Sequence, residues 1–345
     1  MSLVSILRPK DTTLSVPLLL PKSAPAEQVT LPSLSSRPLV SVVVPSFNQG
    51  RFIGDTLRSI LEQDYRPLRI HVIDGGSTDE TVDVLKSFGD LDELDWLSER
   101  DRGVVEAVNK GFARTEGEII AIQSSDDMYL PGAISTMVDA LRQRPRHGLV
   151  YADMETVDAN GGFLFRSNIR PFSVRDFLSK QTWVPQPTAF FRRTLLDVCG
   201  GWDDRYFSAD TELWMRMVFR TQVEKIDKVI AQRRLHDEQR NHQAATIADA
   251  YRRMVQDSPD LQRAGADLRR AAKAGTHIHS IRYNASGSAW KASMHLWSAL
   301  LAAPSLWPNY RDSPLLIPGW MPLRSKLSSV KQALLQARIH EPTLQ

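Results

Sequence analysis

The sequence predicts an α/β protein in which helices flank a mostly parallel sheet. Apolar runs alternate with segments of helical periodicity from residue 39 to about residue 240. Strands and helices that alternate at this spacing are typical of parallel sheets with right-handed crossovers. Polar clusters follow three of the apolar runs, at 46–48, 74–77 and 125–127. Because ligands bind beyond the carboxyl ends of parallel strands, these clusters predict a binding site.

The predicted strands are short runs of apolar, often β-branched residues. They lie at 39–44, 68–73, 94–97, 119–123, 149–153 and 223–233. We also expect an edge strand in 183–191, because its two prolines cannot donate hydrogen bonds to a sheet. Residues 155–180 are interpreted as a loop or hairpin region around Gly161 and Gly162.

The predicted helices carry apolar residues three or four positions apart. In 51–63, for example, Phe52, Ile53, Leu57 and Ile60 have helical spacing. Further helices are predicted at 78–88, 103–113, 132–141, 195–198 and 210–220, and over most of 245–300.

Length and composition indicate a globular protein in three parts. The chain has 345 residues, of which 42% are hydrophobic. We divide it into a Pro/Ser-rich lead-in at 1–38, a main domain at 39–244 and a basic, mainly helical extension at 245–345. The net charge of +3 gives no indication of nucleic-acid binding. The extension, however, holds 13 Lys+Arg against 6 Asp+Glu, which favours contact with an anionic surface or partner.

The cellular compartment is indicated by what the sequence lacks. A single cysteine, Cys199, excludes an intrachain disulfide and a cysteine-based metal cluster, and indicates a reducing, cytoplasmic compartment. There is no run of 18 apolar residues that would predict a membrane span. Residues 1–15 have no continuous apolar segment of the kind found in signal peptides.

Two adjacent carboxylates, Asp126 and Asp127, come three residues after the predicted strand at 119–123. Like charges at close range repel each other and resist burial, so a bare pair is unfavourable at the end of a buried strand. A divalent cation would remove this conflict, and Mg²⁺ typically combines carboxylate oxygens with phosphate oxygens. The pattern predicts a site for a metal and a diphosphate. The alternative is a simple turn before Pro131.

Several motifs coincide in order along the chain. They lie at 41–48, 73–81, 98–103, 107–111, 124–127, 209–216 and 235–236. Together they resemble the family 2 inverting glycosyltransferases, which have the nucleotide-sugar-binding GT-A fold. The resemblance covers roughly residues 39–240, and the succession of motifs is more specific than any one of them.

The resemblance implies a nucleotide site at the first two strand ends. Pro45, Phe47 and Asn48 match the turn that holds the base, and the Phe47 ring would stack on it. The alternative for Phe47 is a hydrophobic plug at the sheet end. Asp74 matches the residue that accepts a hydrogen bond from the base, and a uracil imide would suit it. Many relatives have a second acid here, where this chain has Gly75.

Other features of this region have a structural alternative. Residues 74–79 can form a turn with Ser77 or Thr78 as the N-cap of the next helix. Asp101 and Gly103 match a loop near the nucleotide and the donor sugar. Arg102 is interpreted as a surface charge, and Asn109 as a capping or core residue.

For the diphosphate, the resemblance implies that Asp127 binds Mn²⁺ or Mg²⁺ and that Asp126 lies near the ribose. His236 can reach the metal or the diphosphate in related enzymes, although a lone histidine is more often structural. Arg233 and Arg234 are weaker candidates for contact with the diphosphate.

Asp210 matches the catalytic base of the family. The residue before it is Ala209, where many relatives have a glutamate, and the alternative role for Asp210 is to cap a helix. The resemblance therefore implies an inverting transfer from a nucleotide-diphosphate sugar, preferably a UDP-sugar, to an acceptor hydroxyl. A hexose or N-acetylhexosamine would be transferred to a glycan or lipid-linked glycan during bacterial surface polysaccharide or glycoconjugate synthesis.

Two other functions stay open. A non-catalytic nucleotide-sugar-binding or assembly subunit would share the fold, and Ala209 and the single acid Asp74 favour it. A nucleotidyltransferase with a related sheet is disfavoured, because the first strand is not followed by a Gly-rich phosphate loop.

Tryptophans occur in two further regions. Trp183, Trp202 and Trp214, with Gln186, lie in the half that builds the acceptor side in the family, and either sugar stacking or core packing would explain the tryptophans. In the extension, the tryptophans at 290–307 accompany Lys and Arg, which is typical of helices in a membrane interface. The alternative is a helical layer packed on the main domain.

Overall fold

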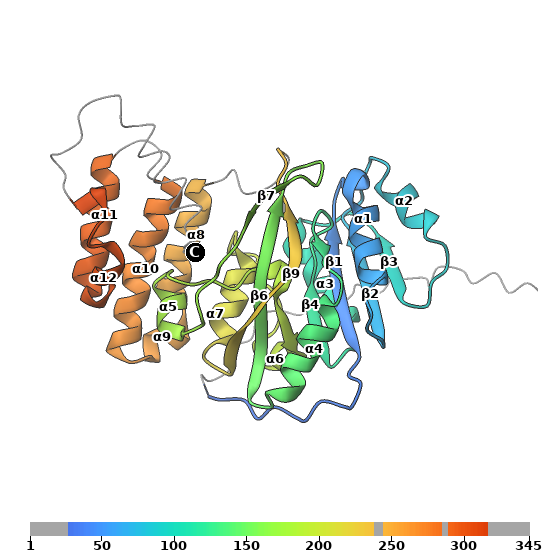
Figure 1. Ribbon diagram of the computed structural model, residues 1–345, viewed down its shortest axis with the longest axis horizontal. Coiled ribbons are helices and arrows are strands. Elements are labelled where there is room, and N and C mark those ends of the chain that lie inside the picture. Colours follow the sequence, from blue (N-terminus) through green and yellow to red (C-terminus); the bar gives the residue numbers. More distant parts are fainter. Residues whose placement is uncertain (1–26, 238–243, 285–288, 317–345) are drawn as a thin grey trace, which may run out of the picture.

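The computed structural model describes residues 27–237, 244–284 and 289–316, and it has the predicted α/β architecture (Figure 1). In the described residues, the strands form one nine-stranded sheet in the order β3-β2-β1-β4-β8-β6-β9-β5, with β7 paired to β6. The strands are β1 (Val40–Ser46), β2 (Leu68–Asp74), β3 (Leu94–Ser98), β4 (Ile119–Ile122), β5 (Met128–Tyr129), β6 (His147–Val157), β7 (Phe163–Arg166), β8 (Phe190–Arg192) and β9 (Gln222–Arg234).

Helices occupy most of the intervals between strands and most of the described residues after β9. They are α1 (Gly50–Leu61), α2 (Thr81–Ser87), α3 (Val104–Arg114), α4 (Ala133–Gln143), α5 (Val174–Leu178), α6 (Thr194–Cys199), α7 (Ala209–Met217), α8 (Ala244–Asp257), α9 (Pro259–Arg263), α10 (Ala266–Asn284), α11 (Ala289–Ala302) and α12 (Trp307–Tyr310). Short 3₁₀ turns are η1 (Gln186–Thr188), η4 (Pro304–Leu306) and η5 (Pro314–Leu316).

Six strands run in the same direction. β1 pairs in parallel with β2 and β4, and β2 pairs in parallel with β3. β8 is antiparallel to both β4 and β6, so β6 runs parallel to β4, and β9 is parallel to β6. The carboxyl ends of β1, β2, β3, β4, β6 and β9 therefore lie at one edge of the sheet, which we call the carboxyl edge.

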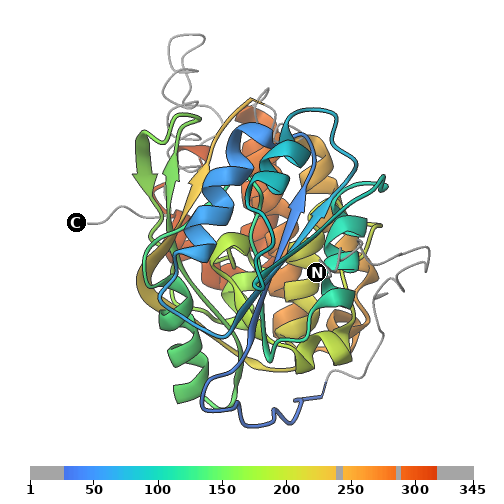
Figure 2. The same cartoon turned by 90° about the vertical axis from the view of Figure 1, so that its right-hand side faces the viewer.

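Alternation along the strands separates two hydrophobic cores. Val42 and Val44 of β1 pack with residues of α1 and α4, whereas Val43 packs on the opposite face with Phe112 of α3. Helices α1, α2 and α4 thus cover one face, and α3, α6 and α7 cover the other (Figure 2, with α1 in blue). This period of two is the expected consequence of side chains that point alternately to the two faces of a strand.

Two sequence-based predictions are wrong in detail. The predicted edge strand is β8, which lies inside the sheet between β4 and β6. Its prolines precede the strand, at η1, so they remove no hydrogen bond from the sheet. The helix predicted from residue 78 begins at Thr81, and its N-cap residue, Glu80, makes no side-chain capping bond. The hairpin around Gly161 is confirmed as β6–β7, but α5 was not anticipated.

The C-terminal helices share the core of the main domain. Tyr251 and Met254 of α8 and Ala271 of α10 belong to the same buried cluster as the helices of the α3 face. A buried ion pair, Arg220–Asp260, joins the end of the α7 segment to α9 at 2.6 Å, with both side chains 2% exposed. Helix α11 packs on the second half of α10 through a separate cluster. No helix in the described ranges is long and apolar enough to cross a membrane.

Part of the predicted lead-in is also described. Residues 27–38 have no regular structure, but they contact the main domain. The N–H of Val29 donates to the carbonyl of Arg220 (2.8 Å), and the Arg192 guanidinium donates to the carbonyl of Pro32 (3.0 Å). Residues 1–26 lie outside the described part of the chain.

Candidate active site at the carboxyl edge

Asp74 ends β2 at the carboxyl edge and is fully buried. Its Oδ2 accepts hydrogen bonds from the N–H groups of Gly76 (3.2 Å) and Ser77 (2.9 Å) and from the hydroxyl of Ser98 (2.6 Å). Its Oδ1 accepts from the Ser77 hydroxyl. A carboxylate has about four acceptor positions, so most of those on Asp74 shape the 75–77 loop. The second oxygen, Oδ1, keeps capacity for one further donor.

The loop after β1 is tied to the loop after β2. Asn48 has a left-handed backbone (φ 52°), a conformation that asparagine tolerates better than most residues. Its N–H donates to the Ser77 hydroxyl (2.7 Å), and its Oδ1 accepts from the N–H of Thr78 (2.9 Å). The N–H of Gly50 donates to Asp79 Oδ2 (2.9 Å). The two loops thus form one rigid unit, and Ser77 serves it through these bonds and not as a helix cap.

Phe47 stands out from this unit. Its side chain is 58% exposed, so the alternative that it plugs the sheet end is wrong. Pro45, by contrast, is buried within β1. It lies beyond Val43, the last β1 residue paired with β4, so its missing N–H is tolerated in a central strand. The arrangement leaves one aromatic face available beside Asp74 and Asn48.

Asp101 occupies the space beside Gly75. A Cβ added to Gly75 would lie 2.9 Å from Asp101 Oδ2, which is closer than real Cβ contacts. Asp101 Oδ1 accepts from the N–H of Gly103 (2.8 Å), whose φ of 118° favours glycine. Burial raises the pKa of Asp101, and the negative charges of Glu106 and Asp74 add to this effect. Many relatives have an acid at the position of Gly75. In this chain the carboxylate of Asp101 lies next to that position instead.

Asp126 and His236 meet at the carboxyl edge although they are far apart in the sequence. Asp126 lies in the turn between β4 and β5, and His236 follows β9. The His236 Nε2 is 3.0 Å from Asp126 Oδ2, and the two side chains are 6% and 15% exposed. The His236 ring also packs on Phe52 of α1, with ring centroids 4.7 Å apart. The antiparallel pairing of β5, which directly follows Asp127, with β9 brings these residues together.

Asp127, the second acid, is held by the end of β9. It is 4% exposed, and its Oδ1 accepts from the N–H of Arg234 (2.9 Å). Burial raises the pKa of Asp127 well above its usual value and the charge of Asp126 acts in the same direction, whereas Arg233 and Arg234 oppose them. The Arg234 side chain donates to the carbonyl of Asp126 (3.2 Å) and lies 3.4 Å from Asp55. The two acids are thus in a turn, as the structural alternative predicted, but that turn is braced by β9.

The donors present fit a hard divalent cation. Asp126 is half-buried and the adjacent Asp127 is buried. Their mutual repulsion contributes to the raised pKa of Asp127. No group of three His, Cys, Asp or Glu side chains suited to a metal occurs in the part of the chain that the structure describes. Mg²⁺ is commonly held by one or two carboxylates together with phosphate oxygens and water, so two acids are sufficient protein donors.

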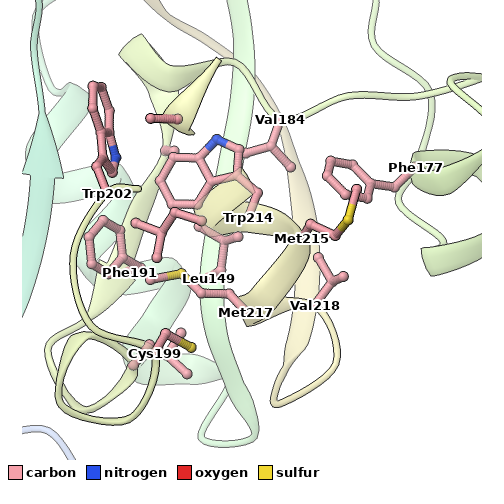
Figure 3. Packing of buried hydrophobic residues seen from close by; sticks show 14 of the residues in the cluster. Leu149, Phe177, Val184, Phe191, Cys199, Trp202, Trp214, Met215, Met217 and Val218 are labelled. Atoms are coloured by element: carbon pink, nitrogen blue, oxygen red, sulfur yellow. The ribbon is translucent and has the colours of Figure 1, made fainter. Parts of the chain in front are cut away.

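Asp210 is in the first turn of α7, two residues after Ser208, the N-cap residue. Helix α7 is fixed by Trp214, which is 1% exposed and meets Phe191 of β8 edge-on at 5.6 Å (Figure 3). The preceding loop is fixed by Asn109 of α3, whose amide exchanges two hydrogen bonds with the backbone of Trp202 (2.7 and 2.9 Å). The core role predicted for Asn109 is confirmed. Asp210 is thereby presented from a rigid helix, half-buried.

Lys180 was missed by the sequence analysis. It is 5% exposed, and its ammonium lies over the rings of Tyr251 (3.9 Å) and Phe177 (5.5 Å). Burial lowers the pKa of Lys180 to about 7, Arg282 acts in the same direction, and Asp210 opposes both. Asp210 is therefore close enough to interact with Lys180. No motif indicates this, because the burial depends on α8 and α10, more than 60 residues further along the chain.

The segment before β8 connects the acceptor-side residues to β4. The Gln186 amide donates to the carbonyl of Ile122 (2.7 Å), and its oxygen accepts from Ser124 (3.2 Å), directly before the acidic pair. Trp202 and Trp214 are core residues, at 6% and 1% exposure, so sugar stacking is wrong for both. Trp183 is half-buried at the border of both cores.

A sequence model described as Glycosyl transferase family 2 matches residues 41–200. An uncharacterized glycosyltransferase of Mycobacterium tuberculosis is 34% identical over 187 residues, which cover 53% of this chain and 70% of that protein. The chain belongs to glycosyl transferase family 2. It also matches an uncharacterized glycosyltransferase of Rickettsia bellii at 31% identity over 140 residues, 40% of this chain but only 20% of that longer protein.

Solved structures show the same fold. S. aureus TarS in complex with UDP-GlcNAc has a TM-score of 0.57 and 17% identity, covering 77% of this chain and 81% of that one. The Pyrobaculum calidifontis mannosyltransferase PcManGT, in complex with GDP-Man and Mn²⁺, has a TM-score of 0.56 and 20% identity, covering 93% and 85%. These likenesses confirm the predicted GT-A architecture with C-terminal helices.

Proposed function

We propose that the protein is an inverting glycosyltransferase that moves a hexose or N-acetylhexosamine from a UDP-sugar to an acceptor hydroxyl. The observation that carries the proposal is the meeting of Asp126 and His236 at the carboxyl edge, beside the linked loops of β1 and β2. The carboxyl edge thus combines the exposed ring of Phe47, which is large enough to stack on a nucleobase, with the acids Asp126 and Asp127. The arginines at the end of β9 supply positive charge at the same edge. This combination suits a nucleoside diphosphate better than a neutral ligand.

The nucleotide would lie against the β1 and β2 loops. Phe47 is exposed and can stack on the base, and Asp74 Oδ1 has acceptor capacity for a uracil imide N–H. Asp101 and Gly103 would flank the ribose or the donor sugar. Both UDP-GlcNAc and GDP-Man occur in the structural neighbours, so the preference for uracil depends on Asp74 alone.

Mn²⁺ or Mg²⁺ would be held by Asp127, with Asp126 and His236 beside it, and would supply positive charge to the departing diphosphate. Asp126 would lie near the ribose. The Arg234 side chain is already engaged by Asp55 and by carbonyl groups, which makes it a brace for the acidic turn. Arg233 is the better candidate for direct contact with phosphate.

The chemical step would be a single displacement. Asp210 accepts the proton of the acceptor hydroxyl, whose oxygen forms a bond to the anomeric carbon. The bond between that carbon and the diphosphate oxygen breaks, and the nucleoside diphosphate leaves. Because one displacement inverts the anomeric centre, the product has the opposite anomeric configuration to the donor. Helix α7 would hold Asp210 in place for this attack.

The acceptor is proposed to be a glycan or lipid-linked glycan in bacterial surface polysaccharide or glycoconjugate synthesis, in the cytoplasm or at the inner face of the cell membrane. The alternative function, a non-catalytic nucleotide-sugar binder, is favoured by the hydrogen bonds that occupy most of Asp74 and by Ala209. The match of Asp210 to the catalytic base of the family favours the enzyme.

A donor screen tests the proposal. UDP-, GDP- and dTDP-sugars are incubated with the full chain, with and without Mn²⁺, and release of nucleoside diphosphate is measured with simple sugar acceptors. We expect release from a UDP-sugar that requires Mn²⁺ or Mg²⁺, and a product of inverted configuration by NMR. Binding of nucleotide without turnover of any donor would instead establish the binder.

A further inference from the structure

Large apolar side chains are exposed on one side of the C-terminal helices. Of nine such residues in the described chain, five are concentrated in α11 and α12. They are Trp290 (61% exposed), Met294 (54%), Trp297 (40%), Leu301 (79%) and Trp307 (46%), and we call them the tryptophan stripe. The first four are spaced by four, three and four residues, which places them on one side of α11.

The opposite side of α11 already has a partner. Leu296, Ala299 and Leu300 are buried against Ala274 and Ile278 of α10. The stripe is therefore a second apolar face that the core of the protein does not use. Trp297 and Trp307 lie together, with ring centroids 6.4 Å apart, so α12 extends the face. Helices α11 and α12 form one end of the molecule, remote from β3 (Figure 1).

The charges around the stripe are positive. From 268 to 311 the sequence contains six Lys and Arg residues and no Asp or Glu. Lys291 is exposed at the Trp290 end. At the Leu301 end, Arg175 and Arg270 line a shallow hollow of about 420 Å³ together with Asp267. Asp267 lies 3.6 and 3.9 Å from the two guanidinium groups, which leaves the hollow with a net positive charge.

We propose that the tryptophan stripe is a membrane-docking surface, which binds the interface of a bilayer that contains anionic phospholipids. Trp side chains favour the headgroup level of a membrane, where one part of the indole is apolar and its N–H is hydrated. Met294 and Leu301 would reach the acyl boundary. Lys291, Arg175 and Arg270 would contact the anionic headgroups at the two ends.

Charge complementarity favours a bilayer over a second copy of this chain. A symmetric contact between two stripes would bring their basic flanks together, and like charges at an interface are unfavourable. The same basic residues at the two ends of the stripe would attract the headgroups of an anionic membrane. The docking goes beyond the proposed function and does not depend on it, because it can be measured without a sugar donor.

Vesicle flotation of the full chain tests the proposal. We expect binding to vesicles of phosphatidylcholine with phosphatidylglycerol, weaker binding to phosphatidylcholine alone, and a loss of binding as salt screens the headgroups. Replacing the three tryptophans (Trp290→Ser, Trp297→Ser, Trp307→Ser) should lower the vesicle partition coefficient about tenfold or more. Thermal unfolding of this variant should be close to wild type, because all three side chains are at least 40% exposed.

A matched variant controls for loss of exposed apolar surface in general. Phe163→Ser with Leu164→Ser removes two side chains that are 62% and 47% exposed on β7, at a distance from α11, and should leave vesicle binding unchanged. Lys291→Glu with Arg270→Glu should weaken binding to anionic vesicles only. Equal flotation of wild type and the tryptophan variant would overturn the proposal. A wild-type dimer that the tryptophan variant converts to a monomer, without vesicle binding by either, would also overturn it.

Discussion

At the scale of single residues, the loop after β2 depends on a glycine. Gly75 leaves room for the Asp101 carboxylate, which stands 2.9 Å from where a Cβ would lie. A sequence comparison at position 75 alone indicates a missing acid, whereas the structure shows an acid contributed by the loop after β3. Gly75 and Asp101 therefore act as a pair.

Gly75→Ala should weaken binding of UDP about tenfold, because the new methyl group displaces Asp101 from the loop. Isothermal titration calorimetry measures this change. Gly265→Ala is the matched control, since a Cβ there meets nothing within 4 Å, and it should bind like wild type. In an Asp101→Ala background, Gly75→Ala should have little further effect. Full additivity of the two substitutions would contradict the pairing.

Lys180 makes a second prediction at this scale. Its pKa is lowered from 10.5 to about 7 by burial, so the folded state binds fewer protons than the unfolded state between these pH values. The groups around it are Phe177, Tyr251, Arg282 and Asp210, with His279 against Tyr251. Because the unfolded state binds more protons, the contribution of Lys180 to the free energy of unfolding should rise with pH from about pH 7 to pH 10.

Lys180→Met should remove this dependence. The stability of the variant relative to wild type should be highest at pH 6 to 7. It should fall toward pH 10, because the free energy of unfolding of wild type rises over this range. Urea unfolding at a series of pH values measures it. A difference between the two proteins that does not change over this range would show that Lys180 keeps its proton in the folded state.

At the scale of elements, the C-terminal helices hold the segment that carries Lys180. The Tyr251 hydroxyl of α8 donates to the carbonyl of Leu178 (2.6 Å), and Gly275 of α10 packs so closely that a Cβ would collide with the same carbonyl. The extension is thus part of the wall beside Asp210. Cutting the chain at residue 244 would expose this core and remove Asp260, which forms the buried ion pair with Arg220.

Asp260→Ala should lower the free energy of unfolding by about 3–5 kcal/mol, because it leaves the Arg220 charge buried and unpaired by Asp260. Chemical denaturation gives this value. Asp249→Ala, in the exposed pairs with Arg252 and Arg253 of the same extension, should change it by less than about 0.5 kcal/mol. Similar values for the two variants would mean that α8 and α9 do not unfold with the main domain.

The sequence predicts elements best where periodicity is local. The apolar runs of β1, β2 and β4 and the apolar face of α1 follow directly from their residues. The interior position of β8 could not be predicted, because strand order depends on pairing between distant segments and the prolines of η1 resemble an edge signal. The start of α2 was misplaced because Ser77 hydrogen-bonds across loops, which local capping rules do not capture.

At the scale of the whole molecule, we propose different tasks for the carboxyl edge and the C-terminal end. The motifs predicted the acids of the edge, and the pairing of β5 with β9 explains why His236 meets Asp126. Contacts between distant segments, such as Lys180 with Tyr251, had no sequence signal. Helix α10 belongs to the core on the α3 face and also packs against α11, so the proposed donor chemistry and membrane docking would take place on packed parts of one molecule.

The central claim is that Asp210 is the base of a sugar transfer. Its most direct test compares kcat and nucleotide affinity in Asp210→Asn, with Asp204→Asn, an exposed acid just before α7, as the matched control. The account predicts that kcat of Asp210→Asn falls about 10³-fold while the Kd for UDP is unchanged, and that Asp204→Asn behaves like wild type. Retention of wild-type kcat by Asp210→Asn would contradict the account.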